Sequence, residues 1–209
     1  MGQTREVSQT DPAPEVLEEA VRVLAEGGVL VMPTDSVYGI GCAMLPHNPG
    51  HERIFEIKRR ERTQTLPLLV ADPEDLTRLG REVSLPAQTL TDSYWPGALT
   101  LVVHAAESVP GEYRASDGTV ALRCPDSTLV RELARRVGVP LAVTSANTHG
   151  VEAATSGAGL EARIVSEADL VLDAGPAPVG VPSTIVDGTS GELRILRQGA
   201  IELCDELKR

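Results

Sequence analysis

Aromatic side chains are scarce in this chain, which has one tryptophan, one phenylalanine and three tyrosines among 209 residues. Proteins that bind single-stranded nucleic acid stack bases on exposed aromatic rings, and a formal net charge of −11 repels a phosphate backbone at long range. Both features argue against a dedicated nucleic-acid-binding protein. The basic cluster Lys58-Arg59-Arg60-Glu61-Arg62 stands out from this acidic background. It is either a solvated charged face or part of a site.

Cysteine is also rare. Cys42, Cys124 and Cys204 are odd in number and form no C-x-x-C pair, so neither a disulfide framework nor a zinc site is indicated. No apolar run approaches the roughly 20 residues that cross a bilayer. The N-terminus has no basic stretch followed by an apolar one, as a secretory signal requires. We therefore expect a cytoplasmic protein with one globular domain.

The motifs of several common enzyme classes are missing. The sequence contains no G-x-x-x-x-G-K-[ST], G-x-G-x-x-G, G-x-S-x-G or H-E-x-x-H. This argues against typical nucleoside triphosphatases, dehydrogenases, hydrolases and metalloproteases. The four histidines are scattered, and we expect structural or surface roles for them. No metal-binding group of side chains is expected from the chain itself.

Helices and strands are expected to alternate along most of the chain. Residues 1–13 are interpreted as a flexible leader, 14–202 as one folded α/β domain and 203–209 as a tail. Apolar periodicity and stop signals predict helices over 14–26, 53–58, 73–80, 84–95 and 127–137, and strands over 29–33, 67–71, 98–105, 119–124, 140–146, 168–175, 182–188 and 192–199. The pattern favours a mixed sheet, with parallel crossovers first and antiparallel pairing later.

Polar side chains gather where these strands end, which is where ligands bind in α/β sheets. The stretch VMPTDSVYGIG, residues 31–41, places hydroxyls, a carboxylate and a tyrosine directly after a strand, and T-S-A-N follows another. A T-S-x-N sequence is more often a turn than a site. Cations are found at Lys58, Arg60, Arg123 and Arg197. Guanidinium groups pair with phosphate and carboxylate oxygens, so the set favours a polyanion and a small zwitterion as ligands.

Several motifs, taken in their order along the chain, resemble those of a known family. They are PTDSVYGIG, IKRRERTQTLPLLV, YWPGALTLVV, TVALRCP, TSAN, PSTIVD and ILRQGAI. Together, over residues 14 to 202, they resemble the YrdC/TsaC-like threonylcarbamoyl-AMP synthases. The resemblance implies a single-domain, twisted mixed sheet flanked by helices, with a central crevice, and it makes residues 14–202 the catalytic domain.

The resemblance also implies a reaction. L-threonine, bicarbonate or CO2, and ATP with Mg2+ would give L-threonylcarbamoyladenylate and pyrophosphate, a nucleotidyl transfer. The product would feed the N6-threonylcarbamoyladenosine modification of tRNA through partner proteins of the TsaD, TsaB and TsaE type. A carbamoyl transfer module using carbamoyl phosphate, and an RNA-binding module using the basic cluster, are the alternatives.

Site residues follow from the resemblance position by position. Lys58 and Arg60 would be catalytic and hold the ATP phosphates. Residues implied for threonine are Thr34, Tyr38, Arg123, Ser145 and Ser183. Residues implied for the nucleotide are Thr119, Asn147, Thr155 and Arg197.

Local geometry is expected at three places. Gly39 and Gly41 would permit a tight turn, and Lys58 and Arg60 would point to the same side of an extended segment. The segment 61–70 is one residue longer than in the family, so Gln64 or Thr65 would replace a family side chain. His149-Gly150 stands where the family has Ser-Gly.

Overall fold

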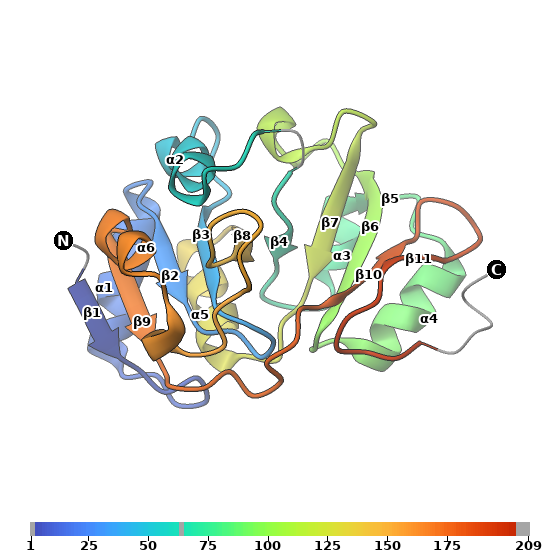
Figure 1. Ribbon diagram of the computed structural model, residues 1–209. Helices are drawn as coiled ribbons and strands as arrows, with labels where there is room; N and C mark the ends of the chain where they lie inside the picture. The colour runs from blue at the N-terminus through green and yellow to red at the C-terminus, as the bar shows by residue number, and fades with distance from the viewer. Residues whose placement is uncertain (1–2, 63–64, 204–209) are drawn as a thin grey trace.

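A computed structural model describes residues 3–62 and 65–203 of the chain, and these residues form one twisted mixed sheet flanked by helices (Figure 1). The strands are β1 (Gln3–Glu6), β2 (Leu30–Met32), β3 (Gly39–Ala43), β4 (Leu68–Leu69), β5 (Gly80–Arg81), β6 (Leu99–Ala105), β7 (Thr119–Arg123), β8 (Leu141–Ser145), β9 (Leu170–Asp173), β10 (Thr184–Asp187) and β11 (Arg194–Arg197). The helices are α1 (Pro14–Ala25), α2 (Pro49–Lys58), α3 (Asp75–Leu79), α4 (Leu85–Tyr94), α5 (Thr128–Val137) and α6 (Ala162–Glu167), with short 3-10 turns at Gly111–Tyr113 and Gly157–Gly159.

The strand order is β1-β9-β2-β3-β8-β4-β7-β6-β10-β11, with β5 beside β6. Pairs β1/β9, β9/β2, β4/β7 and β6/β10 are parallel, and the other pairs are antiparallel. The expected mixed α/β sheet is confirmed. The two ends of the described chain lie at opposite ends of the sheet in Figure 1.

Helices α1 and α5 pack against each other and cover one face of the sheet. Pro14 opens α1, where its missing N–H is not needed. The Ser127 hydroxyl caps α5, and Gly138, with φ 82°, ends it in the left-handed region. Because β2 lies between two cores, Leu30 and Met32 pack toward α1 and α5 while Val31 packs on the opposite side. The unbroken apolar run of this strand is typical of such a position.

The order of parallel and antiparallel pairing differs from the expectation. Antiparallel pairing already begins with the β2/β3 hairpin, and β3 was not expected from the sequence at all. Strand β9 pairs with β1 and β2, whereas β10 pairs with β6 and β11. The late strands therefore do not form one consecutive group, because β9 and β10 join opposite halves of the sheet.

The expected flexible leader is corrected over residues 3–6. Strand β1 pairs with β9 along its whole length, from Gln3 with Leu170 to Glu6 with Asp173. Arg5 also forms an ion pair with Glu19 of α1, with 2.8 Å between Nε and Oε2. The strand is polar and its partner lies far along the chain, so no local pattern predicts it. Of the expected tail, Leu203 is buried, and residues 204–209, including Cys204, lie outside the described residues.

None of the helices in the described part of the chain combines the length and apolarity needed to cross a bilayer.

Candidate active site

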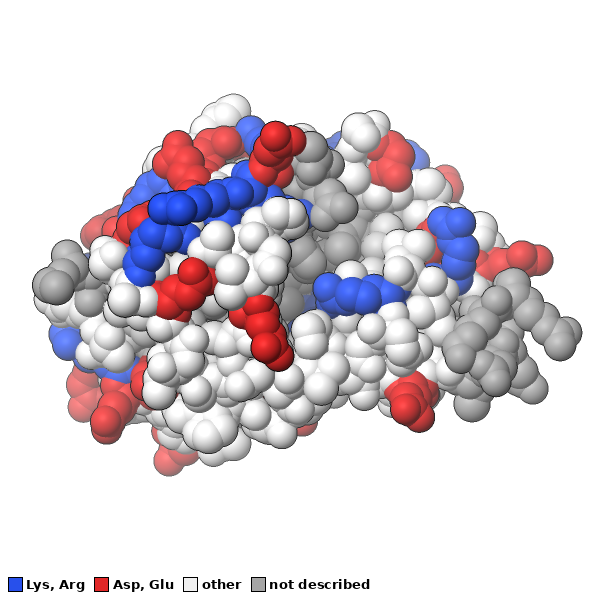
Figure 2. Space-filling view, in the orientation of Figure 1, with Lys and Arg blue, Asp and Glu red and all other residues white. Residues whose placement is uncertain are grey.

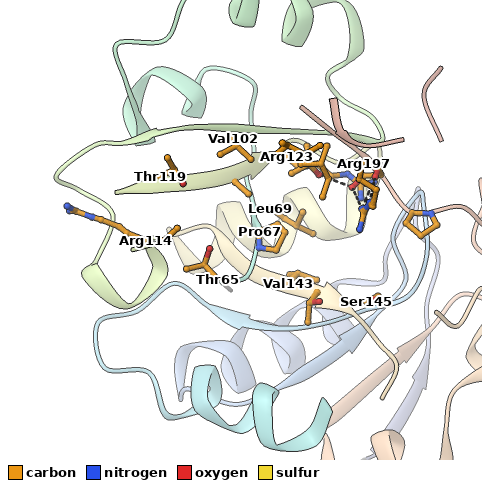
Figure 3. Close-up of a pocket in the computed structure, with 18 of the residues that line it drawn as sticks. Thr65, Pro67, Leu69, Val102, Arg114, Thr119, Arg123, Val143, Ser145 and Arg197 are labelled. Carbon is orange, nitrogen blue, oxygen red and sulfur yellow. Dashed lines mark hydrogen bonds between the residues drawn. The ribbon is translucent and has the colours of Figure 1, made fainter. Parts of the chain in front are cut away.

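A cleft of about 930 Å³ opens between the two halves of the sheet, a volume near the upper end of the roughly 300–1,000 Å³ typical of small-molecule sites. Side chains of β6, β7, β10 and β11 form one wall, and the loop after β2 and strand β8 contribute to the other. Figure 2 shows a hollow near the middle of this face, with basic side chains on both sides. In Figure 3, Arg123 and Arg197 lie together at one end of the cleft, and Arg114 and Thr119 lie at the other.

The cleft brings together most of the side chains that the sequence assigned to a site. Those that line it are Thr34, Tyr38, Arg60, Thr119, Arg123, Ser145, Ser183 and Arg197. Three others, Lys58, Asn147 and Thr155, do not line it. Which ligand each residue contacts stays a prediction.

The loop after β2 is held by its own side chains. The Thr34 hydroxyl donates to the Val37 carbonyl at 2.7 Å and accepts from the Ser36 N–H at 3.1 Å, as in the turns that Ser and Thr favour. The Tyr38 hydroxyl donates toward Asp173 Oδ1 and the Gly175 carbonyl, and it accepts from the Ala174 N–H at 3.0 Å. Burial is the main cause that raises the pKa of Tyr38 to about 12. Tyr38 thus acts here as a neutral phenol that fixes two loops together.

Gly39 and Gly41 have a different role from the expected tight turn, because both lie in strand β3. A Cβ on Gly39 would lie 2.5 Å from Val143 Cγ1, and a Cβ on Gly41 would lie 2.6 Å from Val143 Cγ2. The glycines are therefore explained by the close approach of β8. The Val143 side chain occupies the space that their Cβ atoms would need.

The arginine pair, Arg123 and Arg197, makes one end of the cleft strongly cationic. Arg123 is 5% exposed and donates from Nε to the Gly97 carbonyl at 3.0 Å, from Nη1 to the Ser36 hydroxyl at 2.8 Å and from Nη2 to Asp35. Arg197 donates from Nη2 to the Ser183 carbonyl at 2.7 Å. Burial, followed by repulsion from Arg123, lowers the pKa of Arg197. A nearby anion would relieve that repulsion.

Lys58 is not in an extended segment, and that expectation was wrong. Helix α2 continues to Lys58, and Arg59 then turns the chain in the left-handed region with φ 51°. The Lys58 ammonium donates to the carbonyl oxygens of Ser145 and Asn147, the latter at 2.8 Å, and lies 3.4 Å from Asn147 Oδ1. Its pKa is lowered to about 8, by burial first and by the charge of Arg60 second. The structure therefore brings Lys58 to the T-S-A-N loop rather than to the cleft surface.

Arg60 follows two residues later and does line the cleft. Burial lowers the pKa of its guanidinium. Of the two cations predicted for the phosphates, Arg60 is the one at the cleft surface.

The T-S-A-N loop has the internal bonds of a turn. The Asn147 amide donates to the carbonyls of Thr148 at 3.0 Å and Val151 at 2.7 Å. Ser145 lines the cleft beside this turn. The turn and the site are therefore not exclusive, since the turn places Ser145 at the cleft surface.

The remaining predicted hydroxyl residues have hydrogen-bond partners through their side chains or backbone. Ser183 Oγ lies 2.8 Å from Thr100 Oγ1, and the Thr119 hydroxyl donates to Asp117 Oδ1 at 2.7 Å. Thr155 is exposed, and its carbonyl accepts from the Ala177 N–H at 2.7 Å.

The departures from the family pattern fall in two places. Thr65 lines the cleft, whereas Gln64 lies outside the described residues. His149 is exposed, and its backbone N–H donates to the Lys58 carbonyl at 2.8 Å. The position where the family has Ser-Gly is thereby tied to the end of α2.

Sequence reasoning missed several polar residues of this region. Those that line the cleft include Ser36, Thr100, His104, Arg114 and Asp117. Arg114 and Asp117 lie between β6 and β7, in a segment without any recognisable motif. Asp35 and Ser36 stood inside the PTDS motif, which was the one available signal.

A protein-based metal site does not fit the described residues, among which no group of three or more His, Cys, Asp or Glu side chains could hold an ion. The carboxylates that line the cleft, Glu112, Asp117 and Asp187, do not form such a group, whereas Mg2+ prefers several oxygen ligands. Mg2+ would need phosphate oxygens of a nucleotide as its main ligands.

Comparisons with known proteins identify the family. Residues 22–199 match the model of the Sua5/YciO/YrdC family, described as telomere recombination. The chain belongs to this family.

Two curated relatives and one solved structure are similar over most of the chain. A putative threonylcarbamoyl-AMP synthase of Mycobacterium leprae is 34% identical, over 97% of this chain and 91% of its own length. The threonylcarbamoyl-AMP synthase of Pyrococcus abyssi is 33% identical over 88% of this chain, which spans only 54% of that relative. The crystal structure of P. abyssi Sua5 complexed with L-threonine matches with a TM-score of 0.85 at 30% identity, over 94% of this chain and 57% of that one.

Proposed function

We propose that this Sua5/YciO/YrdC family member is an L-threonylcarbamoyladenylate synthase. The observation that carries the proposal is that predicted site residues from six separate motifs line one cleft. Curated relatives of the chain bear that enzyme name. The substrates are L-threonine, bicarbonate or CO2, and ATP. The product feeds tRNA N6-threonylcarbamoyladenosine formation by proteins of the TsaD, TsaB and TsaE type, and we place the reaction in the cytoplasm.

The chemistry requires no side-chain nucleophile. The α-amine of threonine attacks bicarbonate or CO2 to give a carbamate, with loss of water in the bicarbonate case. A carbamate oxygen then attacks the α-phosphorus of ATP, and pyrophosphate leaves. Bound Mg2+ would supply charge neutralisation on the phosphates. The protein contributes positioning and cationic stabilisation.

The cations of the cleft suit two different ligands. Arg123 fits the carboxylate of threonine, because a guanidinium binds carboxylate oxygens in pairs, and Arg197 beside it serves the nucleotide. Arg60 stabilises the negative charge that develops on the departing pyrophosphate. Tyr38 keeps the loop after β2 in place, as its hydroxyl is already committed to Asp173 and Gly175.

Pyrophosphate release tests the proposal. The protein is incubated with Mg-ATP, L-threonine and bicarbonate, and each component is omitted in turn under CO2-depleted conditions. Release should require both threonine and bicarbonate. Equal ATP turnover without either one would refute synthase activity.

Two parallel assays address the alternatives. Turnover of carbamoyl phosphate in place of bicarbonate would favour a carbamoyl transfer module. Tight tRNA binding without synthesis would favour an RNA-binding module.

A further inference from the structure

Asp35 is a buried carboxylate with no role in the proposed chemistry. It is 5% exposed and does not line the cleft, whereas its neighbours Thr34 and Ser36 do. Its carboxylate contacts Arg123 Nη2, and the side chains of both partners are 7% exposed. Asp35 therefore contacts a cleft-lining arginine without lining the cleft itself.

The loop that carries Asp35 is fixed from two directions. The Asp35 carbonyl accepts from the Val179 N–H at 3.0 Å, and the Ser36 carbonyl accepts from the Gly180 N–H at 2.8 Å. The carboxylate thus sits on a backbone held by its own turn and by the loop before β10. A side chain mounted on such a support can hold a second group in one orientation.

The hydrogen bonds of Arg123 leave a defined part of its guanidinium uncommitted. A guanidinium has five N–H donors, and Gly97, Ser36 and Asp35 accept one bond each from Nε, Nη1 and Nη2. One N–H on each terminal nitrogen has no acceptor among the described residues. Because Arg123 lines the cleft, these remaining donors can serve a ligand bound there.

Charge at this end points to an anionic ligand. Arg123 and Arg197 are close enough for the first to repel the second, and Figure 3 shows them together. Of the two arginines, Asp35 forms an ion pair with Arg123 only, so the positive charge of Arg197 remains to be balanced. Asp35 reduces the repulsion and leaves other N–H donors of Arg123 uncommitted.

We propose that Asp35 is a positioning residue, which holds the Arg123 guanidinium so that its uncommitted N–H donors meet the carboxylate of the amino acid substrate. This inference rests on the proposed function for the identity of that substrate. The orientation of Arg123 is a property of the ligand-free protein and is testable separately.

Calorimetry of Asp35→Ala and Asp35→Asn separates position from charge. Asn retains an oxygen that accepts from Arg123 but lacks the negative charge, whereas Ala removes both. We expect Asp35→Ala to weaken L-threonine binding by about 10–100-fold through misplacement of Arg123. Asp35→Asn should weaken it by only about threefold, because a neutral acceptor gives a weaker bond. ATP affinity should change little in either variant.

A matched control is Glu132→Ala, which breaks ion pairs of α5 away from the cleft and should leave threonine binding unchanged. If Asp35→Ala does not fold, Asp35→Ser replaces it, because its hydroxyl is too short to reach the guanidinium. The proposal is overturned if Asp35→Ala, or Asp35→Ser where it is used instead, binds threonine like the wild type. It is also overturned if Asp35→Ala (or Asp35→Ser) and Asp35→Asn lose equal threonine affinity, because only the charge of Asp35 would then matter. A loss of ATP affinity as large as the loss of threonine affinity would overturn it too.

Arginine side-chain NMR of the ligand-free protein tests the orientation without any substrate. With Arg123→Lys used to assign the signal, the terminal nitrogens of Arg123 should rotate slowly in the wild type and rapidly in Asp35→Ala or its Ser replacement. Equal rotation in both would overturn the positioning role. A wild type that binds no threonine but shows slow rotation would instead refute the proposed function and leave the role of Asp35 as the holder of Arg123 supported.

Discussion

Arg123 and Lys58 are both buried cations, but only Arg123 lines the cleft. Arg123 donates to three residues in two loops, Gly97 before β6 and Asp35 and Ser36 after β2, and still has N–H groups without a protein acceptor among the described residues. Lys58, which is equally buried, directs its ammonium to the oxygens of Ser145 and Asn147. A buried cation is therefore not by itself evidence of ligand binding. The number of donors left after the protein's own acceptors are counted is more informative.

The largest expected effect comes from Arg60→Ala. Arg60 lines the cleft, and its charge is proposed to stabilise departing pyrophosphate, so the pyrophosphate-forming rate should fall at least about 100-fold, roughly 2.7 kcal/mol of transition-state stabilisation. Steady-state kinetics at saturating substrates measures this loss.

The matched control is Arg59→Gly, because Arg59 is exposed and adopts a left-handed conformation that glycine tolerates. Its rate should stay close to that of the wild type. Similar losses in both variants would show that Arg60 has no special place in the reaction.

The next effect is expected from Arg123→Ala. The substitution removes the buried guanidinium that binds the threonine carboxylate, so it should weaken L-threonine binding by about 2 kcal/mol and leave ATP binding unchanged. Calorimetry with each ligand provides the measurement. A loss of ATP affinity alone would reverse the assignment of this end of the cleft. Thermal unfolding is recorded in parallel, since the substitution leaves Asp35 buried without its partner.

Lys58→Met tests the other side of the comparison. If the ammonium holds the T-S-A-N loop, hydrogen exchange of the amides at 146–149 should accelerate by about tenfold, equivalent to roughly 1.4 kcal/mol of local stability. The exchange of α5 serves as an internal reference and should not change. Unchanged hydrogen exchange in the loop together with weaker ATP binding would instead indicate that Lys58 binds the ATP phosphates.

A further test of Lys58 is a pH dependence of stability. The pKa of Lys58 is lowered to about 8 in the folded protein, below the ordinary value of about 10.4. Between these values the unfolded state binds more protons at this group than the folded state, so the Lys58 contribution to the free energy of unfolding rises with pH. The difference in unfolding free energy between wild type and Lys58→Met should therefore increase from about pH 8 to 10. A difference that does not change with pH would contradict a lowered pKa.

The sequence was sufficient for the elements with a local signal. Strand β2 followed from its apolar run, and α5 followed from helical spacing between Ser127 and Gly138. Strand β1 was missed because its polar residues are stabilised by pairing with β9, far along the chain. Strand β3 was missed because Gly39 and Gly41 are typical of turns. They are explained by the Val143 side chain of the neighbouring strand β8, which leaves no room for a Cβ atom.

The sequence also predicted some features of the candidate site and not others. Motif order predicted that Thr34, Arg123, Ser145 and Arg197 would share one cleft, and they do. It could not predict the direction of the Lys58 ammonium, which depends on where helix α2 ends and on the left-handed turn at Arg59. Asp35 was overlooked because its significance depends on a partner in β7 rather than on its own motif.

Mass spectrometry of the nucleotide product tests the central claim most directly. The protein is incubated with Mg-ATP, L-threonine and ¹³C-bicarbonate, and the adenylate fraction is analysed immediately. The account predicts an adenylate that contains both threonine and one ¹³C atom, formed together with pyrophosphate. An adenylate of threonine without the labelled carbon, or ATP hydrolysis without any threonine-containing adenylate, would contradict it.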